Sequence, residues 1–268
     1  MAFMRWATLW FAFAGAALYA AQGDAAGAAE KLSPWHGFTR LDFVVAGRPC
    51  LVVAPKAAAP GRPWIWRTEF FGHEPQTDLA LLERGWYVAY MDAKNLYGAP
   101  KAMALFGQFY AHMVAIHELS PRVVLEGFSR GGLYAFNFAA IHPTRVAALY
   151  LDAPALDIRS WPGGDRSSKQ WVECLAAYGV TEETLPKMKG NPIERIGAVA
   201  TGRIPIIVVV GDADIVVPVA ENTGILEQRY RQLGGTIEVI RKPGVGHHPH
   251  SLADPTAIVN FLLQHAKF

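Results

Sequence analysis

Cysteine is scarce in this sequence, since only Cys50 and Cys174 occur among its 268 residues. Two cysteines so far apart in the chain give no disulfide framework, which excludes the small proteins that several disulfide bonds hold together. The sequence leaves open whether the two thiols pair or stay free.

Charged residues are also few, at 18% of the chain, and the net charge is +2 with no long basic run. Neither a nucleic-acid partner nor an anionic membrane is expected, because both select for clustered basic residues. Hydrophobic residues make up 51% of the chain, which argues against disorder and suffices for one large α/β domain.

No stretch after the N-terminal leader is long and apolar enough to cross a membrane. In that leader, Arg5 precedes an apolar stretch from Trp6 to Ala20, and small residues follow up to Ala28. This layout is typical of a signal peptide over residues 1–28 with cleavage between 20 and 28, so we expect a secreted or periplasmic protein. An uncleaved anchor is the alternative, although the stretch is short for a membrane-spanning helix.

From residue 29 to residue 268 the pattern predicts one domain. The run "FTRLDFVVAGRPCLVVAP" predicts an initial hairpin, and continuous apolar strands then alternate with helical patterns as far as the closing helix "PTAIVNFLLQHA". Such alternation predicts a mostly parallel central sheet with helices on both faces. Residues 156–202 break the rhythm, and their length favours a small helical cap over the strand ends.

A serine lies among glycines in "EGFSRGGL", directly after the apolar run "RVVLE". The spacing of Gly127, Ser129 and Gly131 is that of a nucleophile elbow, a strained turn between a buried strand and a helix. Small neighbours are needed because bulky side chains would clash in the tight turn. The alternative is an ordinary glycine-rich loop, so the motif needs partners to decide its meaning.

Those partners follow in the order acid, then histidine. Asp214 comes just beyond the strand in "VVVGDADIVVP", and His247 lies after the next strand in "KPGVGHHPHSL". A serine nucleophile needs a base, and the base needs an orienting acid. Asp212 and Asp152 are competing acids, since each also lies at a strand end.

The motifs "GFSRGG", "GDADIVVP" and "GVGHHP" resemble those of the α/β-hydrolase superfamily over nearly the whole mature chain. The resemblance implies the α/β-hydrolase fold, with Ser129 as nucleophile, Asp214 as orienting acid and His247 as general base. The superfamily's usual spacing, in which glycine is followed by two residues and an aspartate, favours Asp214 over Asp212.

The amide of Arg130 is expected to donate to the oxyanion, because it lies at a helix N-terminus. The second donor is expected after the strand "WIWRTEF", where the chain lacks the His-Gly pair of many relatives, and the amide of Phe70 or Glu69 takes that place. Arg67 and Glu69 suggest an ion pair near the site, or alternatively cap the strand. We expect Glu69, Tyr97, His248 and Trp161 to contact the substrate.

The cluster "HHPH" invites a metal interpretation, because imidazole is a common ligand. It lacks obvious carboxylate or thiolate partners, so we expect no metal or other cofactor, and His248 or His250 instead lines the pocket.

The expected function is an exported serine esterase that acts on a small-molecule or carbohydrate ester through an acyl-enzyme intermediate. Acyl or methyl esters on carbohydrate are the favoured substrates. A serine peptidase of the same fold and a non-catalytic binding protein that retains the fold are the alternatives. A peptidase is less expected because the chain has no large extra domain to sieve peptides, and a binding protein because the triad is complete.

Overall fold

The computed structural model describes residues 30–268. The proposed signal peptide therefore lies outside the described residues. None of the helices within 30–268 has the length and apolar character that crossing a membrane requires.

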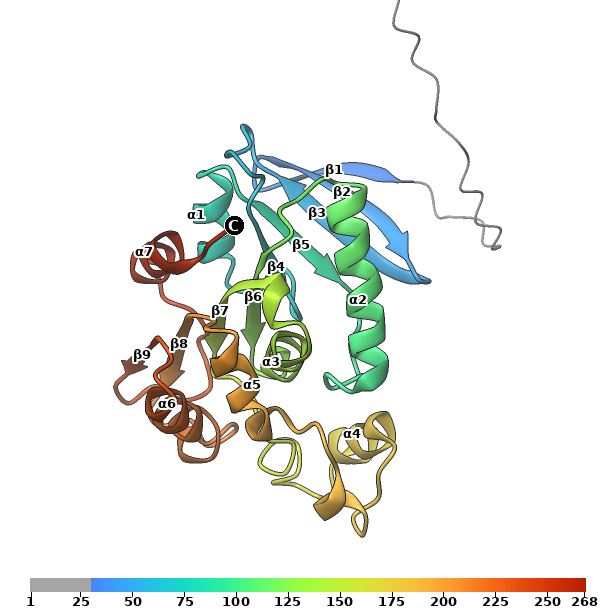
Figure 1. Cartoon of the computed structure of the whole chain (residues 1–268), viewed down its shortest axis with the longest axis vertical. Coiled ribbons are helices and arrows are strands. Elements are labelled where there is room, and N and C mark those ends of the chain that lie inside the picture. Colours follow the sequence, from blue (N-terminus) through green and yellow to red (C-terminus); the bar gives the residue numbers. More distant parts are fainter. Residues whose placement is uncertain (1–29) are drawn as a thin grey trace, which may run out of the picture.

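A sheet of nine strands forms the centre of the molecule, in the order β1-β2-β3-β5-β4-β6-β7-β8-β9 (Figure 1). The first three strands and the contact of β3 with β5 are antiparallel, and every other neighbouring pair is parallel. The strands are β1 (Lys31–Trp35), β2 (Phe38–Val45), β3 (Arg48–Ala54), β4 (Trp64–Arg67), β5 (Tyr87–Met91), β6 (Val123–Phe128), β7 (Val146–Asp152), β8 (Ile206–Gly211) and β9 (Ile237–Lys242).

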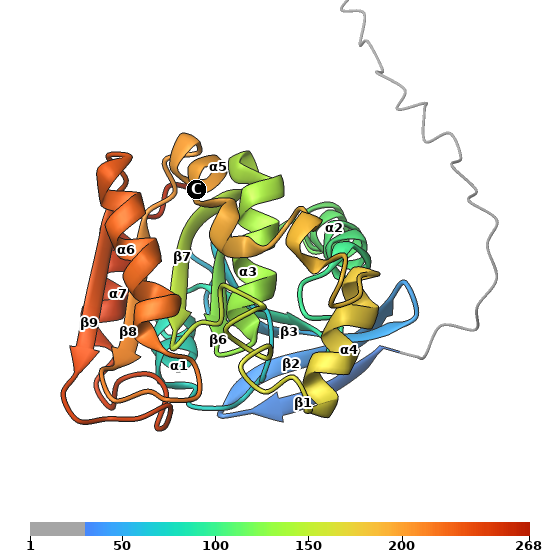
Figure 2. The same cartoon turned by 90° about the horizontal axis from the view of Figure 1, so that it is seen from below.

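Helices cover both faces of this sheet. Figure 2 shows α2, α3 and α6 on one side of the sheet, with α1 and α7 behind it. The helices are α1 (Gln76–Leu82), α2 (Pro100–Ala115), α3 (Gly131–Ile141), α4 (Lys169–Tyr178), α5 (Ile196–Thr201), α6 (Thr223–Gln232) and α7 (Thr256–His265). The predicted fold class, with its mostly parallel sheet, is confirmed.

Alternation along the strands divides the core into two parts. In β4, Trp64 and Trp66 pack on the side of α2 and α3, whereas Ile65 packs on the side of α1 and α7. All three side chains are fully buried, which is the arrangement of a sheet that is covered on both faces.

The initial hairpin is present as β2 and β3, which pair in antiparallel fashion. We did not predict β1 from the sequence, since it is an exposed edge strand that contains Pro34 and lacks an apolar pattern. The strand that we predicted over "WIWRTEF" is too long, since β4 ends at Arg67 and the chain then leaves the sheet.

The segment between β7 and β8 contains α4, α5 and two single-turn 3₁₀ helices. Figure 1 shows α4 apart from the sheet and beside one end of α2. The phenol of Tyr97, in the loop after β5, donates to Glu173 on α4 at 2.9 Å. The segment is thus tied to the loop after β5, whereas its role as a cap stays a prediction.

Candidate active site

Ser129 occupies the sharp turn between β6 and α3. Its φ angle is +48°, in the left-handed region that a non-glycine residue adopts only when its surroundings hold it there. The amide of Ser129 donates to the carbonyl of Asp152, and the Ser129 carbonyl accepts from Ala155. The turn is therefore held against the end of β7.

The glycines of this turn are required by close contacts. A Cβ atom at Gly127 would lie 2.9 Å from the carbonyl oxygen of Gly131, and one at Gly132 would lie 2.6 Å from the Pro154 side chain. The expected steric condition for the elbow is present in the structure.

His247 lies between Ser129 and Asp214. Its Nε2 atom is 2.9 Å from the Ser129 Oγ atom, and its Nδ1 atom is 2.7 Å from Asp214 Oδ2. The other Asp214 oxygen accepts from the amides of Val216 and Val217, both at 2.9 Å. The structure thus brings serine, histidine and aspartate into one hydrogen-bonded line.

Burial alone would raise the pKa of the Asp214 carboxyl. The hydrogen bonds from His247 and from two backbone amides outweigh burial, and they hold the pKa of Asp214 below its ordinary value. Asp214 is consequently a stable carboxylate that can fix the tautomer of His247 and stabilise its protonated form.

The two competing acids have other partners. Asp212 accepts from the amide of Gly244 at 2.7 Å. Asp152 lies 2.6 Å from Nδ1 of His250, and its second oxygen accepts from the amide of Ser251. Of the three aspartates, only Asp214 contacts His247 in the structure.

A small pocket of about 260 Å³ opens beside Ser129. It is lined by Phe70, His73, Ser129, His247, His248 and His250. Ser129 and His247 form part of the pocket wall, and three further imidazole rings and one phenyl ring form the rest. A ligand of a few heavy atoms can therefore reach the serine there.

Solved structures share this arrangement of strands and helices. The chain is similar to acylaminoacyl peptidase from Pyrococcus horikoshii, at 11% identity and a TM-score of 0.64, over 89% of this chain and 42% of that one. This chain thus spans less than half the length of that peptidase. Est1E from Butyrivibrio proteoclasticus matches at 15% identity and a TM-score of 0.59, over 89% of this chain and 99% of that one.

S-formylglutathione hydrolase from Staphylococcus aureus matches at 11% identity and a TM-score of 0.63, over 85% of this chain and 98% of that one. The chain has the α/β-hydrolase fold. No protein-family model and no curated protein matches its sequence.

In this α/β-hydrolase fold, the expected oxyanion donors are the amide of Arg130 and that of Phe70 or Glu69. Within residues 30–268, none of these amides donates to a protein acceptor. Phe70 has a φ angle of +56°, and its side chain is part of the pocket wall. An amide without a protein acceptor can donate to an oxyanion, and the assignment of these amides as the donors stays a prediction.

The loop that carries Phe70 is tied down by Arg67. The guanidinium of Arg67 donates to the carbonyl of Phe70 at 3.1 Å and to that of His73 at 2.6 Å. Arg67 also forms buried ion pairs with Asp78 and Glu126, each at 2.9 Å. It therefore fixes the position of the pocket wall without reaching the pocket itself.

Arg67 and Glu69 do not pair with each other, so that interpretation of the two charges is wrong. Glu69 instead pairs with Arg130 at 2.7 Å, and the carboxylate side chain is only 4% exposed. Burial raises the pKa of Glu69, although the Arg130 guanidinium acts in the opposite direction. The chain leaves the sheet after Arg67, which is why the two side chains find different partners.

Three residues that we expected to contact the substrate do not line the Ser129 pocket. Glu69 is engaged by Arg130, and Tyr97 is fully buried with its hydroxyl on Glu173. Trp161 lies 6.2 Å from the Tyr97 ring and lines a separate pocket with Ile215 and Val216. Of the four expected residues, only His248 reaches the pocket.

His73 and Phe70 reach the pocket from the loop after β4. We missed His73 in the sequence, although the loop "RTEFFGHEP" was expected to supply an oxyanion donor. Its position beyond a strand end was the available signal, because such loops lie over the same edge of the sheet.

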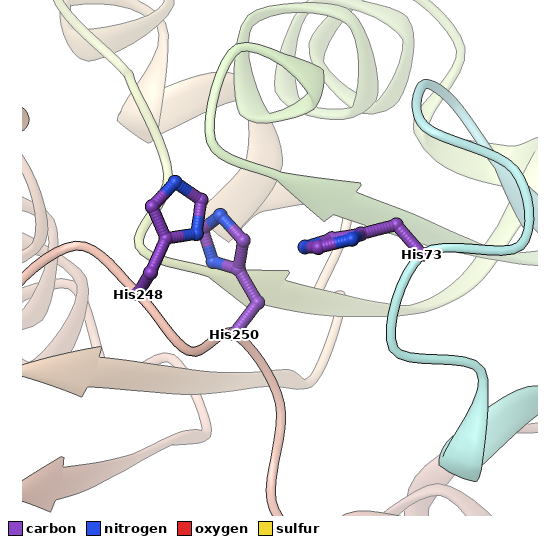
Figure 3. A group of neighbouring side chains, drawn as sticks. All are labelled: His73, His248 and His250. Carbon is purple, nitrogen blue, oxygen red and sulfur yellow. The ribbon is translucent and has the colours of Figure 1, made fainter.

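Nitrogen atoms of His73, His248 and His250 all lie within 4.8 Å of one another. Figure 3 shows the three rings turned toward a common space, with His73 reaching across from the opposite loop. Burial and the neighbouring imidazoles lower the pKa of His248. These rings are the group in the described chain that could hold a metal ion.

Proposed function

We propose that this chain is a serine hydrolase that cleaves carboxylic esters. The observation that carries the proposal is the hydrogen-bonded line from Ser129 through His247 to Asp214. A strained serine at a strand-to-helix turn, a base within hydrogen-bond reach and an oriented acid are the parts that acyl transfer needs.

In the proposed reaction, the Oγ atom of Ser129 attacks the ester carbonyl while Nε2 of His247 takes its proton. The tetrahedral oxyanion accepts hydrogen bonds from the amides of Arg130 and Phe70. The C–O bond to the leaving alcohol then breaks, and the alcohol takes the proton from His247. Water, deprotonated by His247, releases the acid and restores Ser129.

We propose acyl or methyl esters on carbohydrate as the substrate class. The small volume of the pocket favours a short acyl or methyl group at Ser129. His73 and His248 line the same pocket and are more exposed, so they can form hydrogen bonds with sugar hydroxyls at its mouth. Trp161 and Tyr97 give this proposal no support, because neither lines the pocket.

A fluorophosphonate probe tests the nucleophile. The wild-type chain should be labelled, Ser129→Ala should lose all labelling, and Ser33→Ala on the edge strand β1 should label as wild type. Labelling that persists in Ser129→Ala, or that is absent from the wild type, would overturn the proposal.

The bond that is cleaved is tested with acetylated sugars, methyl-esterified sugars and short peptides offered side by side. We expect turnover of a sugar ester and none of the peptides. Turnover of peptides alone would contradict the esterase and indicate a peptidase of the same fold. Labelling by the probe without turnover of any of these compounds would contradict the proposed substrate class.

We also propose that the protein is exported, on the sequence of the leader alone. N-terminal sequencing of the protein isolated from its own cells should then begin between residues 21 and 29. A chain that begins at Met1 would contradict cleavage.

A further inference from the structure

Two loops from distant parts of the chain bring three imidazoles together beside Ser129. His248 and His250 follow β9, whereas His73 lies in the loop between β4 and α1, and their nitrogens come within 4.8 Å of one another (Figure 3). The ring centroids of His248 and His250 are 4.6 Å apart, and that of His73 lies 5.7 Å from His250.

His250 is oriented from behind by a buried carboxylate. Its Nδ1 atom lies 2.6 Å from Asp152 Oδ1, and both side chains are almost fully buried. The second Asp152 oxygen accepts from the amide of Ser251, so this carboxylate has a fixed position. With Nδ1–H donated to Asp152, Nε2 of His250 carries the free lone pair. Metal-binding histidines commonly have a carboxylate in this position.

We propose that His73, His248 and His250 form a binding site for one divalent transition-metal ion of the zinc class. Three neutral imidazoles suit zinc, copper, nickel or cobalt, whereas magnesium and calcium prefer oxygen ligands. Zinc–nitrogen bonds of about 2.0–2.1 Å place tetrahedral ligands roughly 3.3 Å apart. The rings therefore close by up to about 1.5 Å on binding, which rotation of the exposed His73 and His248 side chains provides.

The fourth position of such a site faces the pocket, because all three histidines line the same pocket as Ser129. The ring of His250 lies 4.9 Å from that of His247, and the ring of His248 lies 5.0 Å from it. An ion held there occupies the pocket through which a ligand reaches Ser129. We infer that the bound ion slows the serine reaction, a consequence that rests on the proposed function.

Calorimetric titration with Zn²⁺ tests the site itself and requires no activity. The protein is purified on a tag free of histidine, stripped with a chelator and titrated as wild type, His73→Ala, His248→Ala and His265→Ala. His265 lies at the end of α7 and serves as the matched control.

We expect one Zn²⁺ per wild-type and His265→Ala chain. The affinity of His73→Ala and His248→Ala should be at least about 100-fold weaker, because loss of even an outer-shell partner costs about 10–100-fold. Thermal melts check that each variant is folded. Absence of Zn²⁺ binding by the wild type, or unchanged affinity in both folded variants, would overturn the site.

Fluorophosphonate labelling with and without Zn²⁺ then tests the consequence. Addition of Zn²⁺ should slow the labelling of the wild type. The labelling rate of His73→Ala should be the same with and without Zn²⁺. Zinc binding without slower labelling would overturn the inhibition. Zinc binding by a chain that the probe never labels would overturn the proposed function and leave the metal site standing.

Discussion

At the scale of single residues, three aspartates lie at strand ends near the site, and their hydrogen bonds separate their roles. Asp214 contacts His247, Asp152 contacts His250, and Asp212 holds the amide of Gly244. The sequence alone left all three as candidate acids. The direction of each side chain beyond its strand end decides between them.

Asp214→Asn should lower the rate of fluorophosphonate labelling by about 10³–10⁴-fold, because the amide can hold His247 in the wrong tautomer. Asp212→Asn, two residues away, is the matched control, and its labelling rate should lie within about threefold of the wild-type rate. Asp212 accepts from the amide of Gly244 and contacts neither Ser129 nor His247. Equal labelling rates for the two variants would show that Asp214 is not the orienting acid.

At the scale of elements, the turn from β6 to α3 requires close approach between strand and helix. Gly127 is the next-to-last residue of β6, and the carbonyl oxygen of Gly131 lies close to where a Cβ atom of residue 127 would be. The turn also sets the φ angle of Ser129, so packing at Gly127 and exposure of the serine depend on the same geometry.

Gly127→Ala should destabilise the protein by about 1–3 kcal/mol, because the added methyl group would lie 2.9 Å from the Gly131 carbonyl oxygen. Gly197→Ala in α5 is the control, since a Cβ there meets no atom within 4 Å, and it should be neutral or stabilising by up to about 1 kcal/mol. Urea unfolding measures both free energies. Similar midpoints for the two variants would contradict the steric account of the elbow.

The loop between β4 and α1 is the second element that builds the site. Arg67 is the last residue of β4, and its guanidinium holds this loop by donating hydrogen bonds to two carbonyl groups of the loop. Asp78 and Glu126 neutralise the charge of the guanidinium. A buried ion network thus positions both the Phe70 amide and the His73 ring. The amphipathic patterns near this loop gave no indication of that network.

At the scale of the whole molecule, the sheet divides the core in two, and both cysteines belong to the part that packs against α2 and α3. Cys50 is 3% exposed on β3, and Cys174 is fully buried on α4, and both are free thiols. The question that the sequence left open is thus answered in favour of unpaired cysteines.

Burial raises the pKa of each thiol from its ordinary value to about 12. At pH 8 both thiols should therefore be protonated and buried. A disulfide reagent such as Ellman's reagent should react with neither of them as long as the protein stays folded. After unfolding in guanidinium, two thiols per chain should react, and Cys50→Ala should give one. Rapid reaction of a native thiol would contradict this burial.

The sequence by itself determined the alternation of strands and helices, the elbow around Ser129 and the order of serine, acid and histidine. These features are local, since periodicity, turn sterics and strand ends depend on residues that are close in the chain. The same local logic correctly placed the Arg130 amide at the start of α3 and the Phe70 loop beyond β4.

Only the tertiary structure decided which side chains meet. It joined His73 to His248 and His250, gave Asp152 to His250, paired Glu69 with Arg130, and moved Tyr97 and Trp161 away from the pocket. These contacts join residues from separate loops and strands, and no periodic pattern encodes them. Their partners depend on the twist of the sheet and on where each loop folds back over its edge.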